Sequence, residues 1–294
     1  MFSFSFLVYA FLGALLSGIS LAVFAPFVTL RRISYLGEAL SHIAFAGIAL
    51  AILAGLNLTV TTLIFVMLIA LGITLLAKKH NIQESNTITI FLSLSMALGI
   101  ILISPSKNYS FDLASYLFGN VLLITRNEII TLAVLSVLNI AFVCFFYKEL
   151  FYLTYNPVIA KVYRIKTDLV NLIFMLLLAA NIVINVKSAG IILVTAQLIL
   201  PAVIAFNLVH RLSKAIVISV LVAVFSAFIG FYFSFLLNLP TGACIVVFEA
   251  ILYFLSLLIH DRWRLFYMGV HSHHNMFCCH VLFLHPGYFA VMLF

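Results

Sequence analysis

The sequence predicts an all-α integral membrane protein, a polytopic helical bundle of about nine transmembrane helices. Of its 294 residues, 66% are hydrophobic, and the mean hydropathy is +1.29. Charged residues make up only 8%, against about 25% in soluble domains, which excludes a soluble enzyme and a disordered chain. The long apolar runs lack the period-two alternation of an outer-membrane barrel, so they favour helices.

Nine apolar stretches are long enough to cross a bilayer, whose hydrocarbon core requires about 20 helical residues. They cover residues 5–30, 39–56, 58–77, 87–104, 128–147, 168–186, 189–209, 215–237 and 242–260. Residues 112–125 form a shorter apolar stretch. This stretch either re-enters the membrane, lies at its surface or pairs with a neighbour as a further span.

The basic residues predict the orientation of these spans. With the N-terminus outside and the C-terminus in the cytoplasm, twelve of the fifteen Lys and Arg residues lie in cytoplasmic connections. The other three, Lys107, Arg126 and Lys187, lie outside. Cytoplasmic loops carry such an excess of Lys and Arg, so the net charge of +7 is assigned to them and not to nucleic-acid binding.

Glu38 and His42 are the most informative polar residues within the predicted spans. Their i, i+4 spacing places both side chains on one face of a helix, and an ionisable group within a bilayer costs about 2.5–3.5 kcal/mol on insertion scales. A carboxylate and an imidazole together suit a divalent ion such as Zn²⁺, Mn²⁺ or Fe²⁺. The alternatives are a proton relay and a pair that only makes hydrogen bonds between helices.

Other polar residues in the spans have simpler interpretations. We expect Asn181 and Asn185 to form hydrogen bonds between helices. Gln197 lies one turn before Pro201, where a proline frees a backbone carbonyl, and it either satisfies that backbone or lines a transport pathway. Glu249 in the last span has Lys187 or Arg126 as candidate partners near the outer face.

The composition changes near the end of the chain. Residues 271–285 contain five of the nine histidines together with Cys278 and Cys279. We therefore predict a transmembrane domain over residues 1–262 and a divergent tail over residues 263–294. Histidine and cysteine side chains are zinc ligands. The alternative to a divergent tail is therefore a tail that acts as a metal sensor.

Four ordered motifs resemble the permeases of bacterial zinc, manganese and iron ABC transporters. Residues 31–42 (RRISYLGEALSH) resemble the family signature R-x-S-x-x-G-D-A-x-S-H, and residues 112–119 (DLASYLFG) resemble its D-x-x-S-Y-L-F-G segment. Residues 187–202 are similar to its V-G-x-L-L helix that ends in P-A, and residues 239–243 (LPTGA) to its P-T-G turn. The resemblance covers about residues 5–260.

The resemblance implies a site and a coupling segment. The proposed metal ligands of the family correspond to Glu38 and His42, with Glu in place of the family's Asp. The cytoplasmic segment 150–168, in which Asn156-Pro157 is a helix start, corresponds to the helix that docks on the ATPase. Its contact residues would be Asn156, Pro157, Ala160, Lys161 and Arg164, and the structural positions would be Gly37, Pro201, Pro240 and Gly242.

The resemblance also implies the function. Such a chain is a multi-pass protein of the bacterial inner membrane without an ATPase or a permanently bound cofactor. It imports a divalent metal, zinc or manganese before iron, by alternating access. It pairs with a second permease subunit, a cytoplasmic ATP-binding subunit and an extracytoplasmic metal-binding protein. The alternatives are an autonomous secondary cation carrier or channel that uses Glu38 and His42, and an ABC permease for a metal chelate.

Overall fold

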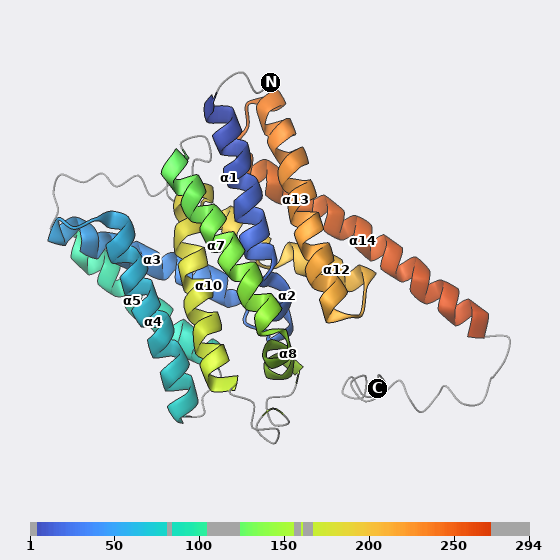
Figure 1. The fold of residues 1–294 in the computed structure, drawn as a ribbon, viewed down its shortest axis with the longest axis horizontal. Helices are drawn as coiled ribbons and strands as arrows, with labels where there is room; N and C mark the ends of the chain where they lie inside the picture. Colours follow the sequence, from blue (N-terminus) through green and yellow to red (C-terminus); the bar gives the residue numbers. More distant parts are fainter. Residues whose placement is uncertain (1–4, 81–83, 105–123, 156–159, 161–166, 272–294) are drawn as a thin grey trace.

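The computed structural model describes residues 5–80, 84–104, 124–155, 160 and 167–271. Within these residues all regular structure is helical, which confirms the predicted all-α class. The helices, shown in Figure 1, are α1 (Ser5–Ala22), α2 (Ala25–Leu30), α3 (Tyr35–Ala54), α4 (Leu58–His80), α5 (Glu84–Ile103), α7 (Arg126–Phe145), α8 (Tyr147–Tyr155), α10 (Thr167–Ala189), α11 (Ile191–Gln197), α12 (Leu200–Leu208), α13 (Leu212–Leu237) and α14 (Thr241–His271).

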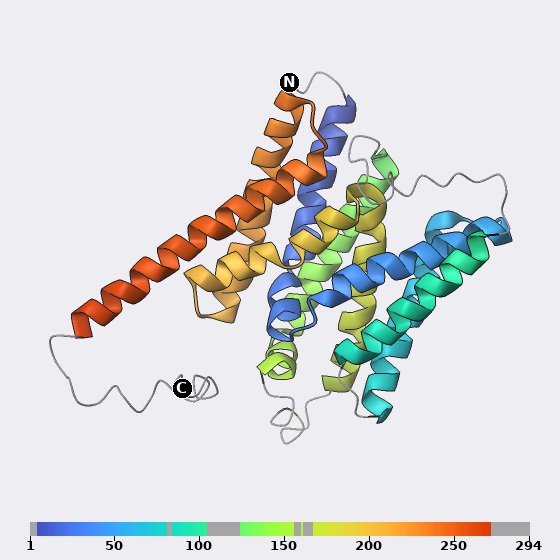
Figure 2. The ribbon, with the colours of Figure 1, turned by 180° about the vertical axis from the view of Figure 1, so that it is seen from behind.

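The bundle is built around α1, α7 and α10, which lie side by side (Figure 1). On one side of these three, α3 packs against α4, α5 and α10. On the other side, α13 packs against α1, α12 and α14. Seen from behind, α11 and α12 cross the middle of the molecule (Figure 2), and α11 contacts both α3 and α14.

Eight segments of the described chain are long and apolar enough to span a membrane. They are α3, α4, α5, α7, α10, α11 with α12, α13 and α14, and each corresponds to one predicted stretch. The remaining prediction, a single helix over residues 5–30, is wrong, because the chain breaks between α1 and α2. Residues 112–123, most of the short apolar stretch, lie outside the described residues.

Asparagine side chains supply a hydrogen bond that the backbone loses at the break after α1. The amide of Phe24 bonds to the carbonyl oxygen of Leu21 at 3.1 Å, so the carbonyl of Ser20 loses its usual helical donor. Asn181 Nδ2 on α10 donates to this carbonyl oxygen at 2.8 Å, and Asn139 Nδ2 on α7 lies 3.4 Å from it. Irregular backbone within a membrane requires such partners. The expected hydrogen bonds of Asn181 and Asn185 between helices are confirmed, since Asn185 Nδ2 lies 3.2 Å from Ser20 Oγ.

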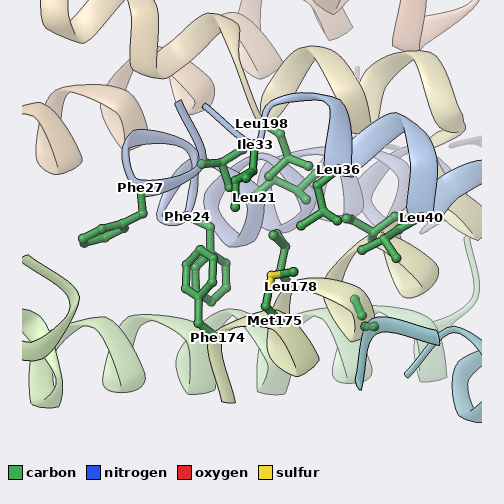
Figure 3. Close-up of a cluster of buried hydrophobic side chains, with 14 of the residues drawn as sticks. Leu21, Phe24, Phe27, Ile33, Leu36, Leu40, Phe174, Met175, Leu178 and Leu198 are labelled. Atoms are coloured by element: carbon green, nitrogen blue, oxygen red, sulfur yellow. The ribbon is translucent and has the colours of Figure 1, made fainter. Parts of the chain in front are cut away.

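The main hydrophobic core lies next to this break. Figure 3 shows Phe24, which precedes α2, beside Phe174 of α10, with Leu36 and Leu40 of α3 nearby. The rings of Phe24 and Phe174 meet edge to face with centroids 5.2 Å apart, a favoured aromatic geometry. The core therefore holds the break and the start of α3 against α10.

The span over residues 191–208 is also broken. Gly190 begins it with φ of +84°, a conformation that glycine adopts without the steric cost of a Cβ. Pro201 has no amide hydrogen to donate to the carbonyl of Gln197, and α11 ends at Gln197. The helix resumes as α12 at Leu200.

Candidate functional site

A tight turn places Glu38 in the first turn of α3. Arg32 adopts a left-handed conformation with φ of +57°, and the amide of Leu36 bonds to the carbonyl oxygen of Ile33 at 2.8 Å. The chain leaves α2 and enters α3 through this turn. Glu38 therefore lies in the first turn of α3, at the positive end of the helix dipole.

Glu38 and His42 lie on a partly uncovered strip near the start of a helix that is mostly buried. α3 is the most buried of the eight candidate spans, yet Glu38 is exposed and His42 is half-buried. Tyr35, one turn before Glu38, is 43% exposed on the same side. Among the described residues, neither Glu38 nor His42 has a hydrogen bond or an ion pair. Both side chains are therefore available to a ligand.

The other side of the first turn of α3 is fixed by close packing. A Cβ on Gly37 would lie 2.7 Å from Cδ1 of Leu198, at the break between α11 and α12. Ser41 Oγ donates to the carbonyl oxygen of Gly37 at 2.7 Å. The small residue at position 37 lets the broken span approach the backbone beside Glu38.

Gln197 lies on the span that touches α3, but its side chain packs elsewhere. A Cβ on Gly18 of α1 would lie 3.6 Å from Gln197 Oε1 and 3.5 Å from the carbonyl oxygen of Ala223 on α13. Gln197 is 1% exposed, and its Oε1 has no hydrogen-bond partner. The structure thus brings Glu38 and His42 together and directs Gln197 toward α1 and α13.

The remaining predicted positions shape turns or lie outside the described residues. The carbonyl oxygen of Pro201 accepts from Ser219 Oγ of α13 at 3.2 Å. Before α14, the amide of Cys244 bonds to the carbonyl oxygen of Pro240 at 3.2 Å, and Gly242 is buried. Of the coupling residues, Ala160 is buried, whereas Asn156, Pro157, Lys161 and Arg164 lie outside the described residues. The tail beyond His271 also lies outside them.

Two charged residues have partners that the sequence did not indicate. Lys187 Nζ lies 2.8 Å from Glu128 Oε1 and 3.2 Å from Thr59 Oγ1. Glu249, for which Lys187 was a candidate partner, instead lies 3.0 Å from Ser226 Oγ. The only sequence signal for the first pair was the TRNE motif at residues 125–128, in which Thr125 and Glu128 form a capping box.

Within the described residues, the two candidate ligands do not form a complete site. No group of three or more His, Cys, Asp or Glu residues in the described part of the chain is placed to hold a metal ion. Protein sites for zinc use three or four protein ligands. A metal bound by Glu38 and His42 would therefore need further ligands from water or from another chain.

Comparisons with known proteins agree with this architecture. The ABC 3 transport family model matches residues 3–260. The manganese transport system membrane protein MntC of Listeria monocytogenes is 36% identical over 264 residues, which cover 90% of this chain and 94% of that protein. The manganese import system permease protein ScaB of Streptococcus gordonii is 30% identical over 261 residues, covering 89% of this chain and 94% of that protein.

A solved structure has the same fold. PsaBC from Streptococcus pneumoniae, solved in complex with a Fab, superposes with a TM-score of 0.74 and 29% identity, covering 86% of this chain and 91% of that one. These relatives confirm a multi-pass bacterial membrane protein whose ATPase is a separate subunit. The chain belongs to the ABC 3 transport family, the membrane permease subunits of ABC transporters.

Proposed function

We propose that this chain is the permease subunit of an ATP-driven importer for a divalent transition metal ion. The observation that carries the proposal is the uncovered pair of Glu38 and His42 on the most buried span. A carboxylate facing lipid is costly, so this strip of α3 faces either a polar cavity or another subunit. The family of the chain favours a cavity through which cargo moves.

A second copy of the permease completes the site. Each chain offers one oxygen donor and one nitrogen donor, and two chains related by a two-fold axis would offer four ligands around a shared pathway. A site assembled from two subunits binds the ion only while the subunits are in one arrangement. Such transient binding suits alternating access, in which the cavity opens first to the binding protein and then to the cytoplasm.

The donor set and the relatives together favour manganese over zinc as the cargo. Carboxylate oxygens suit Mn²⁺, and imidazole accommodates Mn²⁺, Fe²⁺ and Zn²⁺. Two of the relatives are named for manganese transport or import. We assign Mn²⁺ as the preferred ion and Zn²⁺ as the competitor.

A partner ATPase that docks on the cytoplasmic segment 150–168 drives transport through the site. α8 overlaps the start of this segment and contacts α2, α7 and α10. α2 is followed directly by the turn that positions Glu38. Movement of the docking segment is therefore transmitted through α8 and α2 to the first turn of α3.

Uptake by reconstituted transporters with substituted Glu38 tests this proposal. The permease, its ATPase and its metal-binding protein are placed in vesicles, and ATP-dependent Mn²⁺ uptake is measured. We expect Glu38→Gln to reduce uptake at least tenfold and Glu38→Asp to retain it, because Asp keeps the charge. Uptake of Mn²⁺ that is unchanged in Glu38→Gln would remove this residue from the pathway. Uptake of a chelated metal in preference to free Mn²⁺ would contradict the proposed cargo.

A further inference from the structure

Glu249 is a further ionisable side chain within the spans, and unlike Glu38 and His42 it is fully buried. It lies on α14 and is 0% exposed. Oε1 lies 3.0 Å from Ser226 Oγ on α13, and Oε2 is buried without a hydrogen-bond partner. An isolated carboxylate in a low-dielectric interior is strongly disfavoured unless a cation pairs with it. The surroundings of Glu249 therefore decide whether it can be ionised.

No cationic side chain faces Glu249 in the described part of the chain. α11 and α12, which pack on α14, contain no ionisable residue. α13 contains Lys214, which is exposed and about three turns from Ser226, and Tyr232, which is 45% exposed. On α14 itself, the nearest titratable groups are Cys244 and Tyr253, and neither a thiol nor a phenol can carry a positive charge.

Ser226 Oγ lies within hydrogen-bond distance of three acceptors, which are Glu249 Oε1 and the carbonyl oxygens of Val222 and Ala223. Ser226 Oγ is closest to the carbonyl oxygen of Val222, one turn earlier on the same helix. A hydroxyl group has one hydrogen to donate, so it serves only one of these three acceptors. When Ser226 donates to the closer carbonyl oxygen of Val222, a hydrogen bond between Oγ and Oε1 requires a hydrogen on the carboxyl group.

The packing of α13 on α14 excludes water from this pair. A Cβ on Gly230 would lie 2.6 Å from Cα of Ile245, so the two backbones are in direct contact. Ser226 lies one turn before Gly230, and Glu249 lies one turn after Ile245. The pair thus occupies the layer next to the closest approach of the two helices, where an ionised carboxylate could be hydrated only if the helices separated.

We propose that Glu249 is a proton-binding site: its carboxyl group is protonated in this conformation and donates a hydrogen bond to Ser226. Release of the proton would favour separation of α13 from α14, because the ionised group needs water or a cation. This inference does not depend on the assignment of Glu38 and His42, which lie on α3, and it adds a bound proton to the permease.

Infrared difference spectroscopy of the purified full-length chain tests the proposal. The carbonyl stretch of a protonated carboxyl group is separate from the stretches of an ionised carboxylate. At pH 7 we expect a protonated-carboxyl band in the wild type that is lost in Glu249→Gln. The glutamine has the shape of the protonated acid and can donate to Ser226, so this variant should fold. Loss of carboxylate bands alone in Glu249→Gln would overturn the proposal.

A second variant tests the hydrogen bond itself. Ser226→Ala should retain the protonated-carboxyl band and shift it to the higher frequency of a carboxyl group without that bond. Ser219→Ala, a substitution of another buried serine on α13, should leave the band unchanged. Spectra recorded with and without Na⁺ or Mn²⁺ identify a bound cation. A protonated band that appears only when these ions are removed would show that Glu249 holds a cation, and would overturn the proposal.

Discussion

Lys187 Nζ lies 2.8 Å from Glu128 Oε1, so the last turn of α10 and the first turn of α7 meet at one end of the bundle. Thr59, at the start of α4, contacts the same Nζ at 3.2 Å. Lys187 and Arg126 were both assigned to the outer side from the distribution of basic residues. The ion pair requires that the two helix ends share a side, whichever side that is.

Labelling of single cysteines tests which side it is. In a variant without the native cysteines, we expect Lys187→Cys to react with a membrane-impermeant maleimide in intact cells, because Lys187 is 52% exposed at this end. Lys148→Cys, an exposed position at the start of α8, should react only after the cells are permeabilised. The reverse pattern would contradict the predicted orientation with the N-terminus outside.

Asn181 should stabilise the fold through the break in the first span. Asn181→Ala leaves the carbonyl oxygen of Ser20 without its 2.8 Å donor. An unsatisfied buried group costs about 1–3 kcal/mol, so thermal unfolding in detergent should occur at a clearly lower temperature. Ser20→Ala removes the hydroxyl group that lies 2.9 Å from Asn181 Oδ1. The two substitutions should be non-additive by about 0.5 kcal/mol or more, and strict additivity would argue against a shared network.

Gly230 should not tolerate a larger side chain. A methyl group at this position meets Cα and the amide nitrogen of Ile245 at 2.6 and 2.8 Å, and backbone atoms cannot move aside as a side chain can. We expect Gly230→Ala to destabilise the protein by about 1–3 kcal/mol. Gly72→Ala is the matched control, because its methyl group meets only the ring of Phe91, at 3.2 Å. Equal unfolding temperatures for the two variants would contradict the close crossing of α13 and α14.

The spans were predictable because hydrocarbon thickness and composition determine them. Each of the eight long segments corresponds to an apolar run in the sequence. The break within residues 5–30 was missed, although Pro26 near the start of α2 was an available signal. Its repair was not predictable, since Ser20 and Asn181 are 161 positions apart in the sequence. Only the tertiary fold determines which buried amide reaches a free carbonyl.

The candidate site was also predictable only in part. The i, i+4 spacing of Glu38 and His42 predicted a shared helix face, and α3 is helical over both residues. That this face is uncovered on the most buried span required the structure. The contact between Glu249 and Ser226 was not predictable from charge, because a serine carries none. Lys187 and Arg126 were therefore the wrong candidates.

ATP-dependent metal uptake with and without the ATPase tests the central claim most directly. Vesicles that contain the permease are compared with and without its ATPase subunit, for the wild type, His42→Ala and the control His210→Ala, an exposed histidine between α12 and α13. We expect Mn²⁺ uptake that requires both ATP and the ATPase, falls at least tenfold in His42→Ala and is unchanged in His210→Ala. Uptake by the permease alone, driven by an ion gradient, would contradict the account and identify a secondary carrier.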